Sequence, residues 1–138
     1  MTKTVFTSFV ILLLFTVAVS AAEVCVVVDF ADAEDSSSEN KFSDCLDVNS
    51  GETALAVLQR TALTLETKDF GSSLGQAICS INGVGDSSTN CFSSGVWSFF
   101  IANGGDFRLS SDGISSYRVK DDDVLGFLCF NNRHSENR

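Results

Sequence analysis

Five cysteines carry the most specific chemistry in this sequence: Cys25, Cys45, Cys79, Cys91 and Cys129. In an oxidising compartment such cysteines form disulfides by default. An odd number leaves one cysteine over, and two bridges can be drawn in 15 ways, from five choices of that cysteine and three pairings of the other four. Cys79 and Cys91 close the shortest loop between two predicted strands, so we predict this pair first. Zinc is the rival interpretation, but no Cys-x-x-Cys pair exists, and we predict no metal site.

Groups for acid–base or nucleophilic catalysis are scarce. His134 is the only histidine and lies in a polar tail, so a Ser-His-Asp or Cys-His active site would depend on that one side chain. A two-carboxylate glycosidase needs no histidine. The acids, however, gather at 29–47 and 121–123, where we expect loops and turns with solvated charges. The sequence therefore predicts a protein that is not an enzyme.

Calcium is the remaining candidate metal, because acids crowd one segment: Asp29, Asp32, Glu34, Asp35 and Glu39. An EF-hand loop requires a fixed spacing of acids, a central glycine and a closing glutamate. This segment has neither the spacing nor the glycine. We expect a solubilising loop, with weak extracellular calcium binding as the alternative.

Aromatic residues supply the candidate binding surface. On a strand over 96–102, Trp97, Phe99 and Ile101 share one face and Phe100 shares the other with Ser98 and Ala102, so one of the two sets forms core. The turn signal Asn-Gly-Gly follows at 103–105. The predicted ligand-binding residues are Trp97, Phe100, Asn103 and Phe107. Core packing is the alternative role of each aromatic residue.

The elements that position these residues follow from hydropathy patterns. Apolar or alternating runs predict strands at 24–30, 45–48, 76–81, 96–102, 107–109 and 124–130. Helical spacing of apolar residues predicts one helix over 52–63, capped by Asn49 or Ser50, with Glu52, Gln59 and Arg60 facing solvent. The first and last strands are apolar throughout, so we place them side by side in the middle of the sheet. The predicted class is α+β, β-grasp-like, with one mixed sheet of about five strands packed on a single helix.

Residues 1–22 have the pattern of a signal peptide, in which Lys3 precedes an apolar run and small residues follow. Cleavage after Ser20 or after Ala22 satisfies the small-x-small rule equally well. The remainder would be one domain at 23–130 and a polar tail at 131–138. A formal charge of −9 argues against a nucleic-acid partner. We therefore expect a secreted protein with no stable membrane insertion after cleavage.

Five segments in order resemble the transcobalamin-like C-terminal domain family. They read VVVDF at 26–30, SGETALAVLQRT at 50–61, ICSINGVG at 78–85, WSFFIANGG at 97–105 and SSYRVKDDDVLGF at 115–127. The family is a β-grasp module of secreted and surface proteins, similar to the β domain of the cobalamin carriers transcobalamin and intrinsic factor. Its closing turn usually reads Asp-Gly-Asp, whereas here Asp122 stands between Asp121 and Asp123. The carriers' large helical domain has no counterpart in this sequence.

The resemblance implies a secreted, non-enzymatic module that recognises a corrinoid or another small ligand, and no further cofactor. The alternative is an extracellular surface or matrix domain that binds a protein, with its odd cysteine bridging to a partner or to a second copy.

Overall fold

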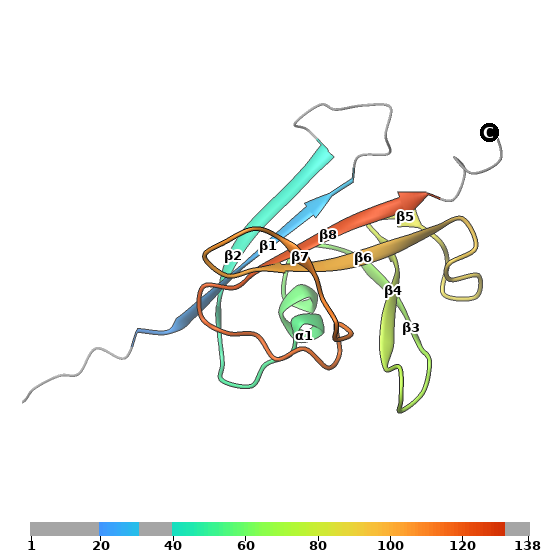
Figure 1. Ribbon diagram of the computed structural model, residues 1–138. Helices are drawn as coiled ribbons and strands as arrows, with labels where there is room; N and C mark the ends of the chain where they lie inside the picture. Colours follow the sequence, from blue (N-terminus) through green and yellow to red (C-terminus); the bar gives the residue numbers. More distant parts are fainter. Residues whose placement is uncertain (1–19, 31–39, 132–138) are drawn as a thin grey trace, which may run out of the picture.

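The computed structural model describes residues 20–30 and 40–131, which form two sheets and one short helix (Figure 1). The five-stranded sheet has the order β2-β1-β8-β6-β7 and the smaller sheet the order β3-β4-β5. The strands of the large sheet are β1 (Ala22–Asp29), β2 (Lys41–Val48), β6 (Gly95–Ala102), β7 (Arg108–Leu109) and β8 (Val124–Asn131). Those of the small sheet are β3 (Leu65–Asp69), β4 (Gln76–Ile81) and β5 (Val84–Gly85), and the helix is α1 (Ala54–Gln59).

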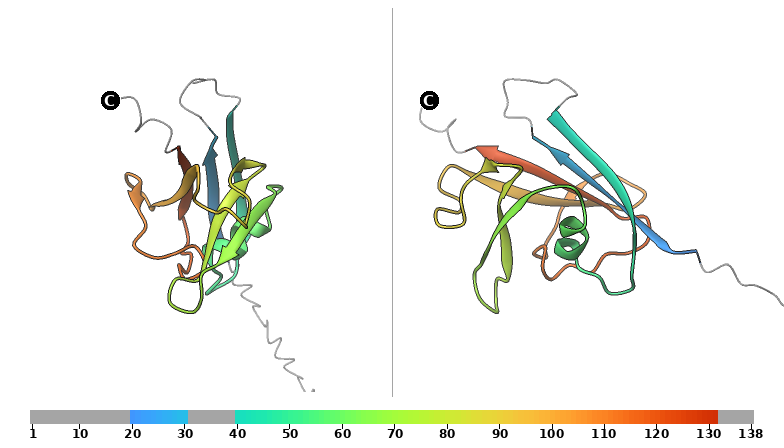
Figure 2. Two further views of the ribbon diagram at one scale, coloured as in Figure 1. Left: turned by 90° about the vertical axis from the view of Figure 1, so that its right-hand side faces the viewer. Right: turned by 180° about the vertical axis from the view of Figure 1, so that it is seen from behind.

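The first and last strands lie side by side at the centre of the large sheet, as predicted. β1 and β8 pair in parallel, from Cys25 opposite Val124 to Asp29 opposite Leu128. β2 and β6 flank them in antiparallel orientation, so the sheet is mixed. Val24, Val26 and Val28 are fully buried on one face of β1. The helix and the small sheet both lie on that side of the large sheet, which we call the inner face (Figure 2).

The expectation of a single sheet was wrong, because the predicted strand at 76–81 is β4 of the second sheet. Its partner β3 was not predicted. The sequence of β3, LETKD, offers only Leu65 as an apolar residue and therefore lacks the alternation that marks a half-buried strand. Ile78 and Ile81 of β4 join the core that also contains Leu58 of the helix. The small sheet and α1 thus cover the inner face together.

The helix is shorter than predicted. Thr53 is its N-cap, in place of Asn49 or Ser50, and its hydroxyl accepts a hydrogen bond from Ala56 N at 3.2 Å. Thr53 also forms a bridge with Arg118, and this pairing holds the preceding residues outside the helix. The helix ends at Gln59, four residues before the predicted end at residue 63, and Ala62 beyond it is exposed.

Glu52 and Arg60 form an ion pair, in which Arg60 is exposed, as predicted, whereas Glu52, also expected to face solvent, is half-buried. The Arg60 guanidinium donates to both oxygens of Glu52, at 2.8 and 3.0 Å, and to the backbone oxygen of Asp47 at 2.9 Å. Burial raises the pKa of Glu52, but the hydrogen bond from Asn49 N and the Arg60 charge outweigh it, so the pKa lies below its usual value. The pair ties the end of β2 to the end of α1.

Two disulfides join parts of the fold, which indicates an oxidising environment. The predicted pair Cys79–Cys91 is confirmed and links β4 to the loop before β6. Cys25–Cys45 joins β1 to β2 at directly opposite positions. Cys129 belongs to neither disulfide and packs, partly buried, against the core. No helix among residues 20–30 and 40–131 has the length and apolar character needed to cross a membrane.

The closing turn before β8 departs from the expectation that its acids are solvated. Asp122 has a φ of 65°, the left-handed conformation for which the resembled family uses glycine. Asp123 is only 1% exposed. Its carboxylate accepts hydrogen bonds at 2.8 Å from the Tyr117 hydroxyl, the Asn103 amide and Lys120 N. Burial, together with this bond to Asp123, raises the pKa of Tyr117 to about 12.

Candidate ligand-binding groove

The outer face of the large sheet, opposite α1 and the small sheet, carries apolar side chains that remain partly or largely exposed. On β6 and β8, Val96 and Phe130 lie directly opposite each other and are 38% and 51% exposed. At the far edge, Leu109 of β7 lies opposite Phe100 of β6. Because successive side chains of a strand point to opposite faces, these residues share the face that the core leaves uncovered.

A groove forms on this face where β8 has no side chain. Gly126 lies in register between Val27 of β1 and Phe100 of β6. The Phe107 ring, from the turn after β6, packs on this glycine: a Cβ atom at residue 126 would lie 2.8 Å from Phe107 Cε1. The groove has a volume of about 340 Å³ and is lined by Val27, Asp29, Lys41, Phe100, Phe107, Gly126, Phe127 and Leu128.

The groove is apolar over most of its length and charged at one end. Asp29 and Lys41 lie opposite each other on β1 and β2, and Asp29 Oδ2 is 3.8 Å from Lys41 Nζ. Both side chains are substantially solvated, so this pair contributes little to stability. A ligand would therefore meet aromatic rings at one end of the groove and a solvated ion pair at the other.

The structure brings together two of the four predicted ligand-binding residues, Phe100 and Phe107. Trp97 lies on the inner face, 7% exposed, and its indole N–H donates to Val84 O at 2.9 Å. Asn103 holds the closing turn, because its amide donates to Asp121 O at 3.0 Å and to Asp123 Oδ1. Trp97 therefore packs in the core, which was the alternative role for the aromatic residues. Asn103 holds the backbone of the closing turn in place.

Sequence reasoning missed Gly126, although the signal was present. A lone glycine inside the apolar run VLGFLCF at 124–130 is typical of a close approach by another group. Val27 and Leu128 were missed for a different reason. They belong to runs that are apolar at every position, so the sequence does not reveal which residues face outward.

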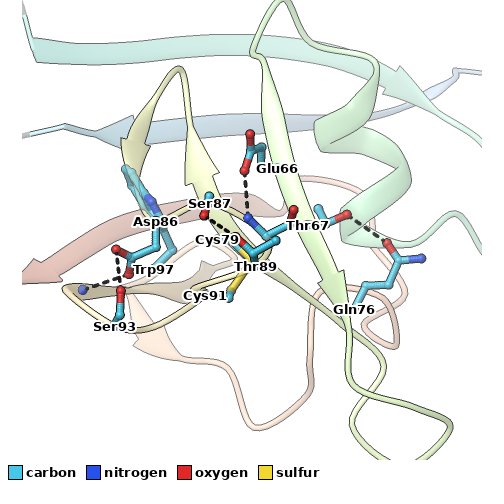
Figure 3. The surroundings of a disulfide bond; sticks show 12 residues. Glu66, Thr67, Gln76, Cys79, Asp86, Ser87, Thr89, Cys91, Ser93 and Trp97 are labelled. Carbon is cyan, nitrogen blue, oxygen red and sulfur yellow. Dashed lines mark hydrogen bonds between the residues drawn. A yellow bond between two sulfur atoms is a disulfide. The ribbon is translucent and has the colours of Figure 1, made fainter.

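Asp86 is a second carboxylate that the sequence did not single out, and it fastens the loop bridged by Cys79–Cys91 (Figure 3). It accepts hydrogen bonds from the hydroxyls of Ser93 and Ser94 and from the backbone N–H groups of Ser94 and Gly95. These bonds, those from Ser94 first, lower the pKa of Asp86 to about 2. The serine donors belong to the loop and Gly95 is the first residue of β6, so Asp86 ties the loop to the start of that strand and has a structural role.

One cluster among the described residues has metal-ligand spacing but not metal-ligand chemistry. Glu23, Cys25 and Cys45 place ligand atoms within 4.8 Å of one another. Both sulfurs are joined in a disulfide, however, and zinc binds cysteine as the thiolate. The acidic segment considered for calcium lies mostly at 31–39, outside the described residues, as do the signal peptide up to residue 19 and His134.

Comparison with known proteins gives no assignment: the sequence matches no family model and no curated protein.

Proposed function

We propose that this chain is a secreted, non-enzymatic binding module that holds a small planar ligand in the outer-face groove. The observation that carries the proposal is the convergence of Phe100 and Phe107 on one open apolar groove over Gly126. Both were selected from the sequence as exposed aromatic surface. An aromatic or conjugated ring placed there would bury apolar area and stack against the phenyl rings.

The size of the groove limits what it can hold alone. A volume of about 340 Å³ is at the lower end of the range for small-molecule sites. A corrinoid is larger, so the groove would contact only one edge of the macrocycle and leave the rest for solvent or for a partner. This fits the resembled family, in which a β-grasp domain covers one side of cobalamin. The mixed sheet with β1 and β8 at its centre supports the β-grasp assignment.

Export is a separate part of the proposal and has its own test. Two disulfides support an oxidising destination. N-terminal sequencing of the exported protein should find Ala21 or Glu23 as the first residue, according to whether cleavage follows Ser20 or Ala22. Retention of Met1 on a protein found inside the cell would contradict export.

Calorimetric titration of the mature protein with dicyanocobinamide and with cyanocobalamin tests the ligand. Cyano forms are used because His134 could capture an aquo-cobalt. We expect saturable micromolar binding that Phe107→Ala weakens roughly tenfold, the equivalent of about 1.4 kcal/mol. Gly126→Ala should also weaken binding, because its Cβ displaces the Phe107 ring. Absence of heat with either ligand at high micromolar concentration would overturn the corrinoid assignment.

Phe130→Ala is the matched control. Phe130 and Phe107 are both 51% exposed, but Phe130 does not line the groove. Loss of an equal apolar area outside the groove should leave ligand affinity unchanged. If Phe130→Ala weakened ligand affinity as much as Phe107→Ala, the ligand would be adsorbing to apolar surface in general.

A protein partner is the second candidate, and the exposed pair Val96 and Phe130 favours it. This pair continues the apolar surface beyond the groove, and extended apolar patches mark interaction sites. Here the roles of the variants reverse: Phe130→Ala should reduce partner capture and Gly126→Ala should not. A covalent bridge through Cys129 has less support, because this residue packs against the core. A disulfide-linked dimer on a non-reducing gel would support the covalent bridge through Cys129.

A further inference from the structure

A second apolar pocket lies at the inner face, between the two sheets. Its volume is about 170 Å³, and it is separate from the outer-face groove because only Phe127 lines both. Its deep wall consists of side chains at least 92% buried, namely Ile78, Trp97, Phe99, Ile114 and Phe127. The remaining lining residues are Leu74, Gln76, Ala77, Phe92, Val96 and Gly113.

The pocket is a consequence of how the inner face is covered. The helix has only six residues and packs Leu55 and Leu58 into the core. The part of the inner face near Trp97 is covered by β4 and by the Cys79–Cys91 loop instead (Figure 3). β4 and β6 are in contact but belong to different sheets and share no ladder of hydrogen bonds. The space between them is bordered by side chains and is open to solvent at its rim.

The lining defines the chemistry of what can enter. No charged side chain lines the pocket. Two polar side-chain groups of the lining already have partners: the Trp97 N–H donates to Val84 O, and Gln76 Oε1 accepts from the Thr67 hydroxyl at 3.3 Å. No buried side-chain nitrogen or oxygen among the described residues lacks a hydrogen-bond partner. A charged or strongly polar guest would therefore lose hydration without gaining a bond.

The rim of the pocket holds apolar side chains in unusual settings. Leu74, on the turn between β3 and β4, is 72% exposed, more than any other large hydrophobic residue among those described. Phe92 has a φ of 72°, which is costly for a bulky side chain, and its ring stacks on Phe70 with centroids 5.4 Å apart. A guest in the pocket would give Leu74 an apolar surface to cover.

We propose that this pocket binds a neutral, apolar molecule the size of a single six-membered ring, and that Leu74 packs over the bound guest. The pocket is open to solvent at its rim, and its volume is close to that of apolar cavities of about 150 Å³ that accept benzene, so it suits one ring and excludes a corrinoid. The inference is independent of the proposed function, because it concerns the other face of the sheet and another class of ligand.

Fluorescence of Trp97 provides the test. Trp97 is the only tryptophan of the chain and lines this pocket but not the groove. Iodobenzene, a heavy-atom quencher, should quench its emission saturably, and benzene should reverse the quenching by competition. Benzene should also raise the midpoint of thermal unfolding, because it binds only the folded chain. Quenching that rises without saturation, or no rise in the midpoint, would overturn the proposal.

Three variants complete the design. Leu74→Ser should weaken iodobenzene binding about tenfold without changing stability, since Leu74 is exposed in the unliganded protein. Leu109→Ser removes a leucine of similar exposure, 66%, that does not line the pocket, and should leave binding unchanged. Equal affinities of the Leu74→Ser and Leu109→Ser proteins would contradict the role of Leu74. Loss of quenching in Phe107→Ala would place the probe in the groove and overturn the proposal.

Discussion

At the scale of single residues, the carboxylates of this acidic chain have two distinct roles. Most of those at 20–30 and 40–131 are exposed, but Asp123 and Asp86 each accept several hydrogen bonds and hold chain segments together. The sequence could not reveal Asp123, because its donors come from Asn103, Tyr117 and Lys120, which converge only in the folded chain. Gly126 could have been recognised, since an isolated glycine in an apolar strand indicates a close contact.

Replacing Asp123 by Asn should destabilise the protein by about 2 kcal/mol. The substitution removes the charge from three hydrogen bonds and places an amide NH₂ where donors already point. Urea denaturation gives the free energy of unfolding. Asp122→Asn is the control, because it makes the same charge change at an exposed neighbour. If both variants lost a similar free energy of unfolding, the cause would be the change in net charge and not the loss of the buried hydrogen bonds.

Replacing Asp122 by Gly should stabilise the protein slightly, by about 0.5 kcal/mol. Asp122 has a φ of 65°, which costs a residue with a Cβ more than it costs glycine, although the greater entropy of unfolded glycine offsets part of the gain. Thermal unfolding would measure the shift. A clear loss of stability would mean that the Asp122 side chain contributes to the turn.

At the scale of elements, the strands that the sequence predicted well are those with continuous apolar runs and the alternating strand β4, whose bounds 76–81 match the prediction. β1, β6 and β8 agree with prediction to within one or two residues. β2 extends further toward its N-terminus than expected, because residues 41–44 (KFSD), of which only Phe42 is apolar, pair with β1. The short α1 differs because Thr53 is held in a bridge to Arg118. These departures arise from pairings between distant segments, which local periodicity does not encode.

The loop fastened by Asp86 should lose stability in acid. The folded pKa of about 2 lies below the ordinary value of 3.8, so the Asp86 contribution is fully present above about pH 4 and is lost as pH falls toward 2. Asp86→Asn should therefore reduce the dependence of the urea midpoint on pH over this range. Asp106→Asn changes charge equally at another exposed site and serves as the control. Identical pH profiles for Asp86→Asn and the parent protein would contradict this role.

At the scale of the whole molecule, the two faces of the large sheet have different roles. The inner face forms the core with α1 and the small sheet, while the outer face keeps apolar residues in contact with solvent. The α+β layout and the central pairing of the terminal strands followed from the sequence. The second sheet did not, and neither did the choice between Trp97 and Phe100 as the outward residue. That choice depends on which face the core occupies, and alternation alone leaves it undetermined.

Backbone amide shifts recorded while dicyanocobinamide is added would test the outer-face groove as a binding site, because they locate the ligand residue by residue. We expect saturable shifts at Val27, Phe100, Phe107, Gly126 and Leu128, with none along α1. The same shifts should diminish in Gly126→Ala, whose added Cβ displaces the Phe107 ring. Shifts confined to other surfaces, or a spectrum unchanged by the ligand, would contradict a binding site in the outer-face groove.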